Sequence, residues 1–284
     1  GGEVTGLASD VVVPPSFRAG VANSADEVRQ RVRELLNGGA DFIKIIATGA
    51  VLTPGTKPGA PEYTEAELKA AVDEAANYGT FVAAHAHGAE GIKRAVRAGV
   101  RSIEQGSLLD DEAIALMKQH GTWLVADIYN GDYIASEGKK QGWSAEILRK
   151  NDETTEAQRA GFRKAVAAGV KIAYGTDSGV YPHALVANQL PYMVRYGMTP
   201  MQAIQSATIE AARLMQWEDR VGSLAPGKYA DLVAVEGDAL ADLTNFAKVA
   251  VVMKGGVGGK GPGQGGELAE GMGAPLRVVL VMAL

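Results

Sequence analysis

The chain has 284 residues, of which 46% are hydrophobic, so it can bury a substantial core as one large domain or as a domain with an appendage. Its net charge of -5, with acids and bases interspersed, excludes a basic face for nucleic acid or for anionic lipid, and we expect a small-molecule ligand. Because cysteine is absent, any metal ion must be held by histidine, carboxylate or a modified lysine.

The chain begins GGEVTGLASD, which has neither the basic nor the apolar region of a signal peptide and also lacks an initiator methionine. The compartment is therefore left open between cytoplasmic and exported. No run reaches the roughly 18 to 20 apolar residues of a membrane-spanning helix, so we expect none.

Five times a helical segment ends at glycine and leads directly into an apolar strand. Ser24 with Glu27 and Thr64 with Glu67 form capping-box patterns, and Asp110 precedes a third helix as its N-cap. Strands that are apolar throughout and alternate with amphipathic helices predict a parallel sheet in an α/β fold. The expected strands are residues 41–49, 81–88, 100–107, 122–129 and 171–179.

The part that follows the fifth strand has a different pattern. Thr199 and Pro200 predict the start of a helix over about 201–215, and residues 222–236 and 248–256 predict short strands. From residue 255 to residue 273 there are ten glycines and no periodicity, so we expect residues 257–284 to form a flexible, glycine-rich tail.

Lys44 lies within an apolar strand, where burying an unpaired ammonium is costly. It is therefore expected to be paired in a salt bridge, neutral or chemically modified. Burial lowers the pKa of a lysine, and a neutral amine can react with carbon dioxide to give a carbamate, which is an anionic oxygen ligand. From the residue type alone, the salt bridge is the favoured alternative.

His85 and His87 are two residues apart in a strand and therefore face the same side. This spacing suits two metal ligands, or one ligand with an outer partner, and structural histidines are an equal alternative. Asp177 follows the fifth strand, where barrel enzymes place catalytic acids, although a turn or capping aspartate has the same pattern.

Three further residues are weaker candidates for the lining of a pocket. Asp127 and Tyr129 end the fourth expected strand, and His183 follows the fifth strand in the sequence YPH. A surface histidine and a packed tyrosine are the plain alternatives.

Together these segments resemble the amidohydrolase superfamily, in particular its imidazolonepropionase-like and Xaa-Pro dipeptidase-like branch. The resemblance covers about residues 24–256 and rests on FIKIIATG, VAAHAHG, SIEQGSLLDD, GTDSGVYPH, GMTPMQAIQSAT and GSLAPGKYADLV. It implies a TIM-type (β/α)8 metal-dependent hydrolase barrel. Residues 1–220 would be a part of this barrel that is incomplete at the N-terminus, with about five βα units, and residues 221–256 the remnant of a small β-sandwich.

The resemblance also implies a mechanism. Lys44 would be carboxylated by carbon dioxide and bridge up to two divalent metals, with zinc expected, while His85 would bind the second metal and Asp177 the first. A metal-bound hydroxide would attack an amide or peptide carbonyl of a small substrate such as a dipeptide or an N-acyl amino acid, and Asp177 would transfer the proton to the leaving amine. Residues implied to orient ligands or substrate are His87, Asp127, Tyr129 and His183.

Two departures from the family pattern favour an alternative. Gln105 stands where the family has a second histidine ligand, and an amide oxygen is a weaker ligand for zinc than imidazole. The His-x-His pair of the first family strand is not found before Lys44. The alternative is a catalytically impaired barrel fragment or pseudoenzyme subunit, as a homo-oligomer or completed by a partner chain. A periplasmic-type binding protein would need a second α/β lobe, which the pattern does not predict.

Overall fold

The computed structural model describes residues 20–260 and 276–278. Contacts divide the chain into two compact units. The first contains the residues up to Ala126 together with Asn130–Lys171, and the second contains Asp127–Tyr129 and the residues from Ile172 onward. The predicted boundaries after residues 220 and 256 concern the domains of the family and stay predictions.

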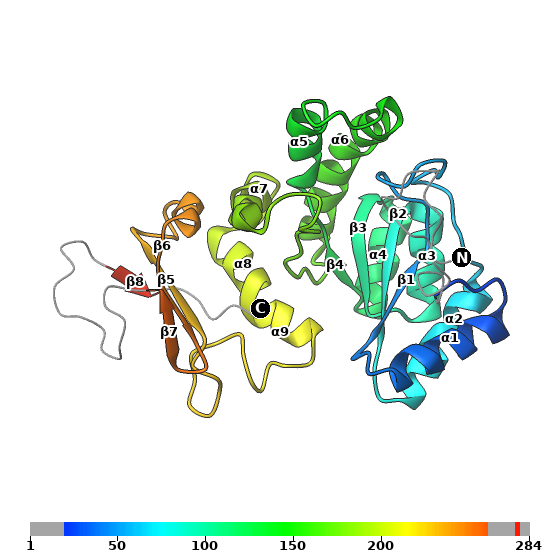
Figure 1. Cartoon of the computed structure of the whole chain (residues 1–284), viewed down its shortest axis with the longest axis horizontal. Helices are drawn as coiled ribbons and strands as arrows, with labels where there is room; N and C mark the ends of the chain where they lie inside the picture. Colours follow the sequence, from blue (N-terminus) through cyan, green and yellow to red (C-terminus); the bar gives the residue numbers. More distant parts are fainter. Residues whose placement is uncertain (1–19, 261–275, 279–284) are drawn as a thin grey trace. The chain divides into compact units, whose positions relative to one another are not determined.

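The first unit is built on a four-stranded parallel sheet with the strand order β1-β2-β3-β4 (Figure 1). The strands are β1 (Ile43–Ile46), β2 (Val82–Gly88), β3 (Ser102–Leu108) and β4 (Trp123–Val125). The helices are α1 (Ala25–Asn37), α2 (Glu65–Asn77), α3 (Ala89–Ala98), α4 (Asp111–His120), α5 (Asn130–Tyr133), the π-helical η2 (Ile134–Gly138) and α6 (Ala145–Ala168). The predicted α/β fold with a parallel sheet is confirmed.

Local sequence accounts for where these helices begin. The side chains of Ser24 and Asp110 accept hydrogen bonds from backbone N–H groups in the first turns of α1 and α4. Thr64 and Glu67 form a reciprocal capping box at α2. All three predicted caps are confirmed. Helix α6 begins at Ala145, where the Ser144 side chain accepts a hydrogen bond from the Ile147 N–H as its N-cap.

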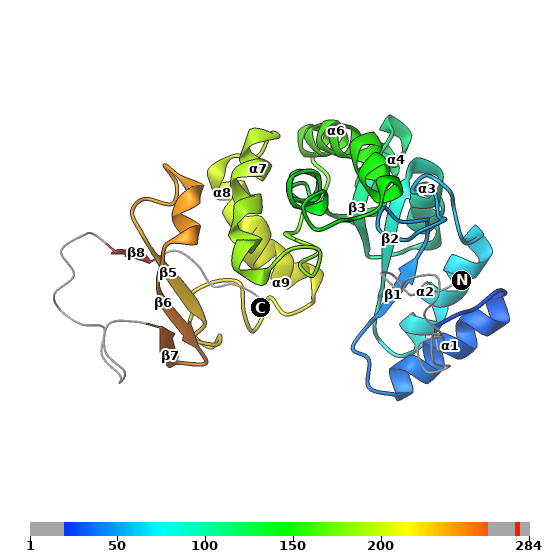
Figure 2. The same ribbon diagram turned by 45° about the horizontal axis from the view of Figure 1, so that its top comes forward.

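The core of the first unit lies where the helices pack against the sheet, and α2 and α3 lie along β1 and β2 in both views (Figures 1 and 2). Ile103, Leu124 and Ile92 are completely buried. In β1, by contrast, Ile43 and Ile45 are buried whereas Lys44 is exposed. The prediction that Lys44 is buried was therefore wrong. The physical reason is that β1 lies at the edge of this sheet, so a side chain on the face opposite Ile43 and Ile45 has a neighbouring strand on one side only.

The fifth predicted strand, residues 171–179, is not among the strands of the described residues. Its first residue accepts one backbone hydrogen bond, from the Leu124 N–H to the Lys171 carbonyl at 2.8 Å. Beyond it, the Tyr174 N–H donates to the carbonyl of Ser206 at 2.9 Å instead of to a neighbouring strand. The backbone N–H of Tyr174 is therefore satisfied within the second unit.

The second unit contains short helices and an antiparallel sheet with the strand order β7-β6-β5-β8 (Figure 2). The predicted helix over 201–215 is confirmed in position, although a π-helical segment interrupts it. The helices are η3 (His183–Asn188), α7 (Gln189–Arg195), α8 (Pro200–Gln205), η4 (Ser206–Glu210), α9 (Ala211–Leu214) and η5 (Leu243–Ala247). The strands are β5 (Leu232–Glu236), β6 (Val249–Lys254), β7 (Val257–Lys260) and β8 (Leu276–Val278).

Strands β7 and β8 lie within residues 257–284, which were predicted to form a flexible, glycine-rich tail. Gly255 and Gly256 have φ angles of 57° and 80°, which suits a two-residue hairpin turn between β6 and β7. Glycine can pair in such a strand because the ladder uses only backbone groups. The rest of the predicted tail, residues 261–275 and 279–284, lies outside the described residues.

In the part of the chain that the structure describes, no helix combines the length and the apolar composition needed to cross a bilayer.

The contact between Gly88 and Gly59 predicts a specific effect on stability. A Cβ at Gly88 would overlap the backbone carbonyl of Gly59, whereas a Cβ at Gly59 would meet only Leu108 at 3.6 Å. We expect Gly88→Ala to lower the free energy of unfolding by about 1–3 kcal/mol, the usual cost of overpacking. Urea denaturation followed by circular dichroism measures this. Gly59→Ala is the matched control, and equal losses in the two variants would contradict the prediction.

Candidate functional site

Lys44 and His85 lie on the same face of the parallel sheet. Lys44 is in register with Ala83 and Ile46 with His85, so His85 is one strand across from Lys44 and two residues further along. From standard strand spacings their Cα atoms are about 8 Å apart. This distance allows a lysine side chain and an imidazole to approach a common ligand.

His85 and His87 are both buried at the carboxyl end of β2. Their rings meet edge to face, with centroids 4.7 Å apart. His87 Nδ1 lies 2.7 Å from Ser107 Oγ, and the His87 N–H donates to Thr48 Oγ1 at 2.9 Å. Burial, together with the nearby His85, holds the pKa of His87 well below its usual value. His87 is therefore a neutral ring that is fixed in orientation beside His85.

A carboxylate on the same face was not predicted. Glu104 is in register with His85 and accepts a hydrogen bond from Ser102 Oγ at 2.6 Å. The signal was present in the alternation of β3, where Ser102 and Glu104 fall on one face and the buried Ile103 falls on the other. Glu104 therefore adds an acidic group next to His85.

Gln105, the residue in place of the family histidine, is 5% exposed and has a φ angle of 68°. Its backbone carbonyl accepts a hydrogen bond from Gln158 Nε2 at 3.1 Å. Its side-chain Oε1 is buried without a hydrogen-bond partner among the described residues. Burying an amide oxygen without a hydrogen bond costs free energy, so this atom is suited to bind a hydrogen-bond donor or a metal ion.

In the second unit, Asp127, Tyr129 and Asp177 interact electrostatically with Tyr181, a buried residue that was not predicted. The pKa of Tyr181 is raised, mainly by burial and further by electrostatic interaction with these three residues, although a hydrogen bond with Thr176 acts in the opposite direction. The rings of Tyr129 and Tyr181 meet edge to face at 5.1 Å. The structure thus brings together three of the predicted residues within this unit.

Asp177 and His183 are both exposed. His183 Nδ1 lies 3.0 Å from Ser178 Oγ, which fixes the ring near the turn that carries Asp177. The predicted residues are therefore divided, with Lys44, His85, His87 and Gln105 in the first unit and Asp127, Tyr129, Asp177 and His183 in the second.

Backbone strain distinguishes two of the predicted ligands. Among the described residues, the non-glycine residues with a left-handed backbone are Gln105, Asp177 and Gln216. Gln216 directly follows Met215, the C-cap of α9, and left-handed residues are common at this position. Gln105 and Asp177 do not follow a helix, and strain of this kind concentrates at functional sites.

The donor types fit a divalent metal ion, because imidazole, carboxylate and amide oxygen are all metal ligands and Gln105 Oε1 has no other partner among the described residues. Within the described residues, however, no three histidine, aspartate or glutamate side chains come together closely enough to hold a metal ion. The ligand roles predicted for these residues therefore stay predictions.

Comparison with known proteins identifies the family. The model of the amidohydrolase family matches residues 7–260. This chain belongs to the amidohydrolase family. Among curated proteins, it is 36% identical over 251 residues to ochratoxinase from Aspergillus niger, covering 86% of this chain and 52% of the relative. The predicted family resemblance is confirmed.

Solved structures agree with this family assignment. A Xaa-Pro dipeptidase with bound methionine in the active site is 44% identical, with a TM-score of 0.82 over 90% of this chain and 63% of the other. A prolidase complexed with N-methylphosphonate-L-proline is 33% identical, with a TM-score of 0.82 over 89% of this chain and 64% of the other. The chain thus spans about half the length of the curated ochratoxinase that it matches.

The contact between His87 and Ser107 predicts a loss of stability when the hydroxyl is removed. In Ser107→Ala, a buried imidazole nitrogen would lose its partner, which costs about 1–3 kcal/mol. Thermal unfolding measures the effect. Ser136→Ala is the control, because the Ser136 hydroxyl is exposed and donates a hydrogen bond to the nearby Tyr133 carbonyl. A Ser107→Ala variant as stable as this control would show that the hydrogen bond contributes nothing.

Proposed function

We propose that this amidohydrolase chain carries much of the active site of a metal-dependent hydrolase that cleaves an amide or peptide bond in a small substrate. The left-handed backbone at Gln105 and Asp177 is the observation that carries the proposal, because helix ends do not explain it. The similarity to ochratoxinase and to prolidases supports a substrate such as an N-acyl amino acid or a dipeptide.

The ligand set that we propose is Lys44, His85 and Asp177, with Gln105 as a weaker ligand. Zinc is the expected metal, and the Lys44 amine, which is exposed, would be carboxylated by carbon dioxide. When bound, the metal would polarise the substrate carbonyl and make water more acidic.

The protein's own groups would move the proton. The oxygen of a water molecule adds to the carbonyl carbon, the carbon–nitrogen bond breaks, and the Asp177 carboxylate carries the proton of the water to the leaving nitrogen. The products are an acid and an amine. The exposed position of Asp177 leaves its carboxylate accessible for this transfer.

Other residues would orient the ligands and the substrate. The neutral His87 ring, fixed by Ser107, would hold His85 in place through their edge-to-face contact. Asp127 and Tyr129, packed around Tyr181, and His183 beside Ser178 are proposed to contact the substrate.

A second candidate is a catalytically impaired subunit that needs another copy or a partner chain. Two observations favour it: no group of three histidine, aspartate or glutamate side chains that could hold a metal was found in the described residues, and Gln105 replaces imidazole. Metal content and turnover separate the two candidates.

The first experiment loads the purified chain with zinc or cobalt and assays N-acyl amino acids and dipeptides. The proposal predicts at least about one bound metal ion per chain and measurable turnover. Asp177→Asn is expected to lower kcat by roughly 10²- to 10⁴-fold through loss of proton transfer. Lower metal content together with no turnover would rule out independent catalysis and favour the impaired subunit.

The second experiment tests Gln105 as a limiting ligand. Replacing its amide with imidazole in Gln105→His should raise the zinc-to-protein ratio, because imidazole binds zinc better. Elemental analysis after dialysis measures this. Gln119→His makes the same replacement at an exposed position of α4 and is the control. An unchanged ratio in Gln105→His would show that this glutamine does not limit metal binding.

A further inference from the structure

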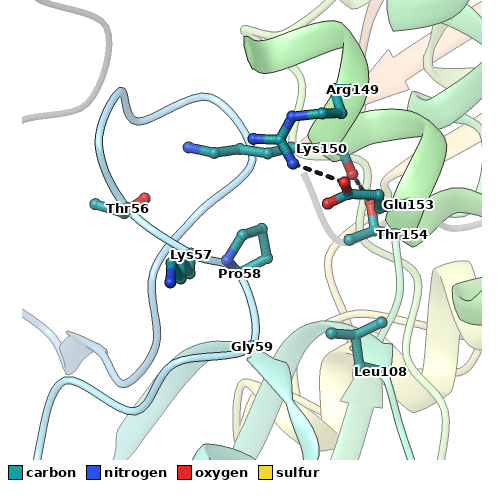
Figure 3. A pocket seen from close by; sticks show the side chains of 9 residues that line it. All are labelled: Thr56, Lys57, Pro58, Gly59, Leu108, Arg149, Lys150, Glu153 and Thr154. Atoms are coloured by element: carbon teal, nitrogen blue, oxygen red, sulfur yellow. Dashed lines mark hydrogen bonds and ion pairs between the residues drawn. The ribbon is translucent and has the colours of Figure 1, made fainter.

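The first unit contains a pocket of about 240 Å³ at the carboxyl ends of β2 and β3 (Figure 3). One wall is the loop of residues 56–59, the opposite wall is α6 at residues 149–154, and Leu108, the last residue of β3, lies between them. Gly59 in the loop packs against Gly88, the last residue of β2. The pocket therefore lies at the carboxyl ends of the strands, as do His85 and His87 near the end of β2.

Hydrogen bonds of a buried lysine and its partner connect α6 to residues 53–55, directly before the loop. Lys150 is 2% exposed, its Nζ donates to the Thr53 carbonyl at 2.8 Å, and it pairs with Glu146 at 2.8 Å. The same Glu146 carboxylate accepts a hydrogen bond from the Gly55 N–H at 2.9 Å. Because these contacts hold both walls in place, the pocket is formed before any ligand binds, which lowers the cost of binding.

The charges around the pocket do not cancel. Arg149 is paired with Glu153 at 2.6 Å, and Lys150 is paired with Glu146. Lys57 is exposed and makes no ion pair with the residues that the structure describes. The pocket thus has one cation that is not neutralised, which suits a ligand with a single negative charge.

The remaining surface is partly apolar. Pro58 is buried next to Lys57, and the Leu108 side chain extends into the pocket between the two walls (Figure 3). Typical ligand pockets have about 300–1,000 Å³, so this smaller volume selects a small ligand. A small molecule with both an apolar part and one negative charge matches the lining.

We propose that this pocket binds a small apolar monocarboxylate, with its carboxylate at Lys57 and its apolar part against Pro58 and Leu108. Two sources have this chemistry: the carboxylate end of an intact amide substrate, or the acid released by hydrolysis. Whether the carboxylate belongs to the substrate or to the released acid rests on the proposed function. Binding of a monocarboxylate to this pocket does not depend on that function.

The test uses the full chain without metal, in the presence of EDTA, and N-acetyl-L-leucine as the probe. Titration calorimetry should show binding of this acid and much weaker binding of the neutral N-acetyl-L-leucinamide. Lys57→Gln should weaken binding of the acid about twofold to fivefold, in line with the loss of one exposed ion pair. Lys57→Arg should retain it.

Lys140→Gln is the matched control, because it removes the same charge from an exposed lysine outside the pocket. Equal affinity for the acid and the amide, or unchanged affinity in Lys57→Gln, would overturn the proposal. Circular dichroism of each variant confirms folding, which an exposed position should preserve.

A second measurement on the metal-loaded chain identifies the source of the carboxylate. If the site holds the substrate, Lys57→Gln raises KM and leaves kcat unchanged; if it holds the released acid, the variant weakens product inhibition and leaves KM unchanged. Since binding is measured without metal, absence of turnover contradicts the proposed function alone, and absence of binding contradicts the carboxylate site alone.

Discussion

The register of the parallel sheet is the constraint on which the candidate site depends. In a parallel pair, partners in register point to the same face, so β1, β2 and β3 present Lys44, His85 and Glu104 side by side on one face. A slip of one residue in β2 would turn both histidines toward the helices. The buried β2 residues of the opposite face, Val82, Ala84 and Ala86, oppose that slip because it would turn them away from the helices.

Backbone geometry adds information that side-chain chemistry alone does not contain. Gln105 and Asp177 both have a left-handed conformation, which costs free energy for any residue other than glycine. At Gln105 this conformation accompanies a register shift in the pairing of β2 with β3. The same residue types in a regular strand would have ordinary φ angles, so these strained positions distinguish candidate ligands from other polar residues.

The candidate site and the pocket share a dependence on the segment between β1 and α2. This segment provides Thr48, which bonds to the backbone of His87, and Lys57, which lines the pocket. The hydrogen bond from Lys150 of α6 to the Thr53 carbonyl holds this long segment in place. One segment therefore supports the histidine pair at one end and forms a wall of the pocket at the other.

The sequence by itself determined the features that depend on near neighbours and on ordered motifs. These include the helix caps at Ser24, Thr64 and Asp110, the parallel α/β fold and the amidohydrolase family. Capping is local because the donor and the acceptor are only three residues apart.

Only the tertiary structure decided that Lys44 is exposed, that glycine-rich residues form β7, and that Lys57 lines a pocket together with residues of α6. Each of these three features depends on which segment, distant in the sequence, packs beside the residue. Neither hydrophobic periodicity nor residue type specifies that neighbouring segment.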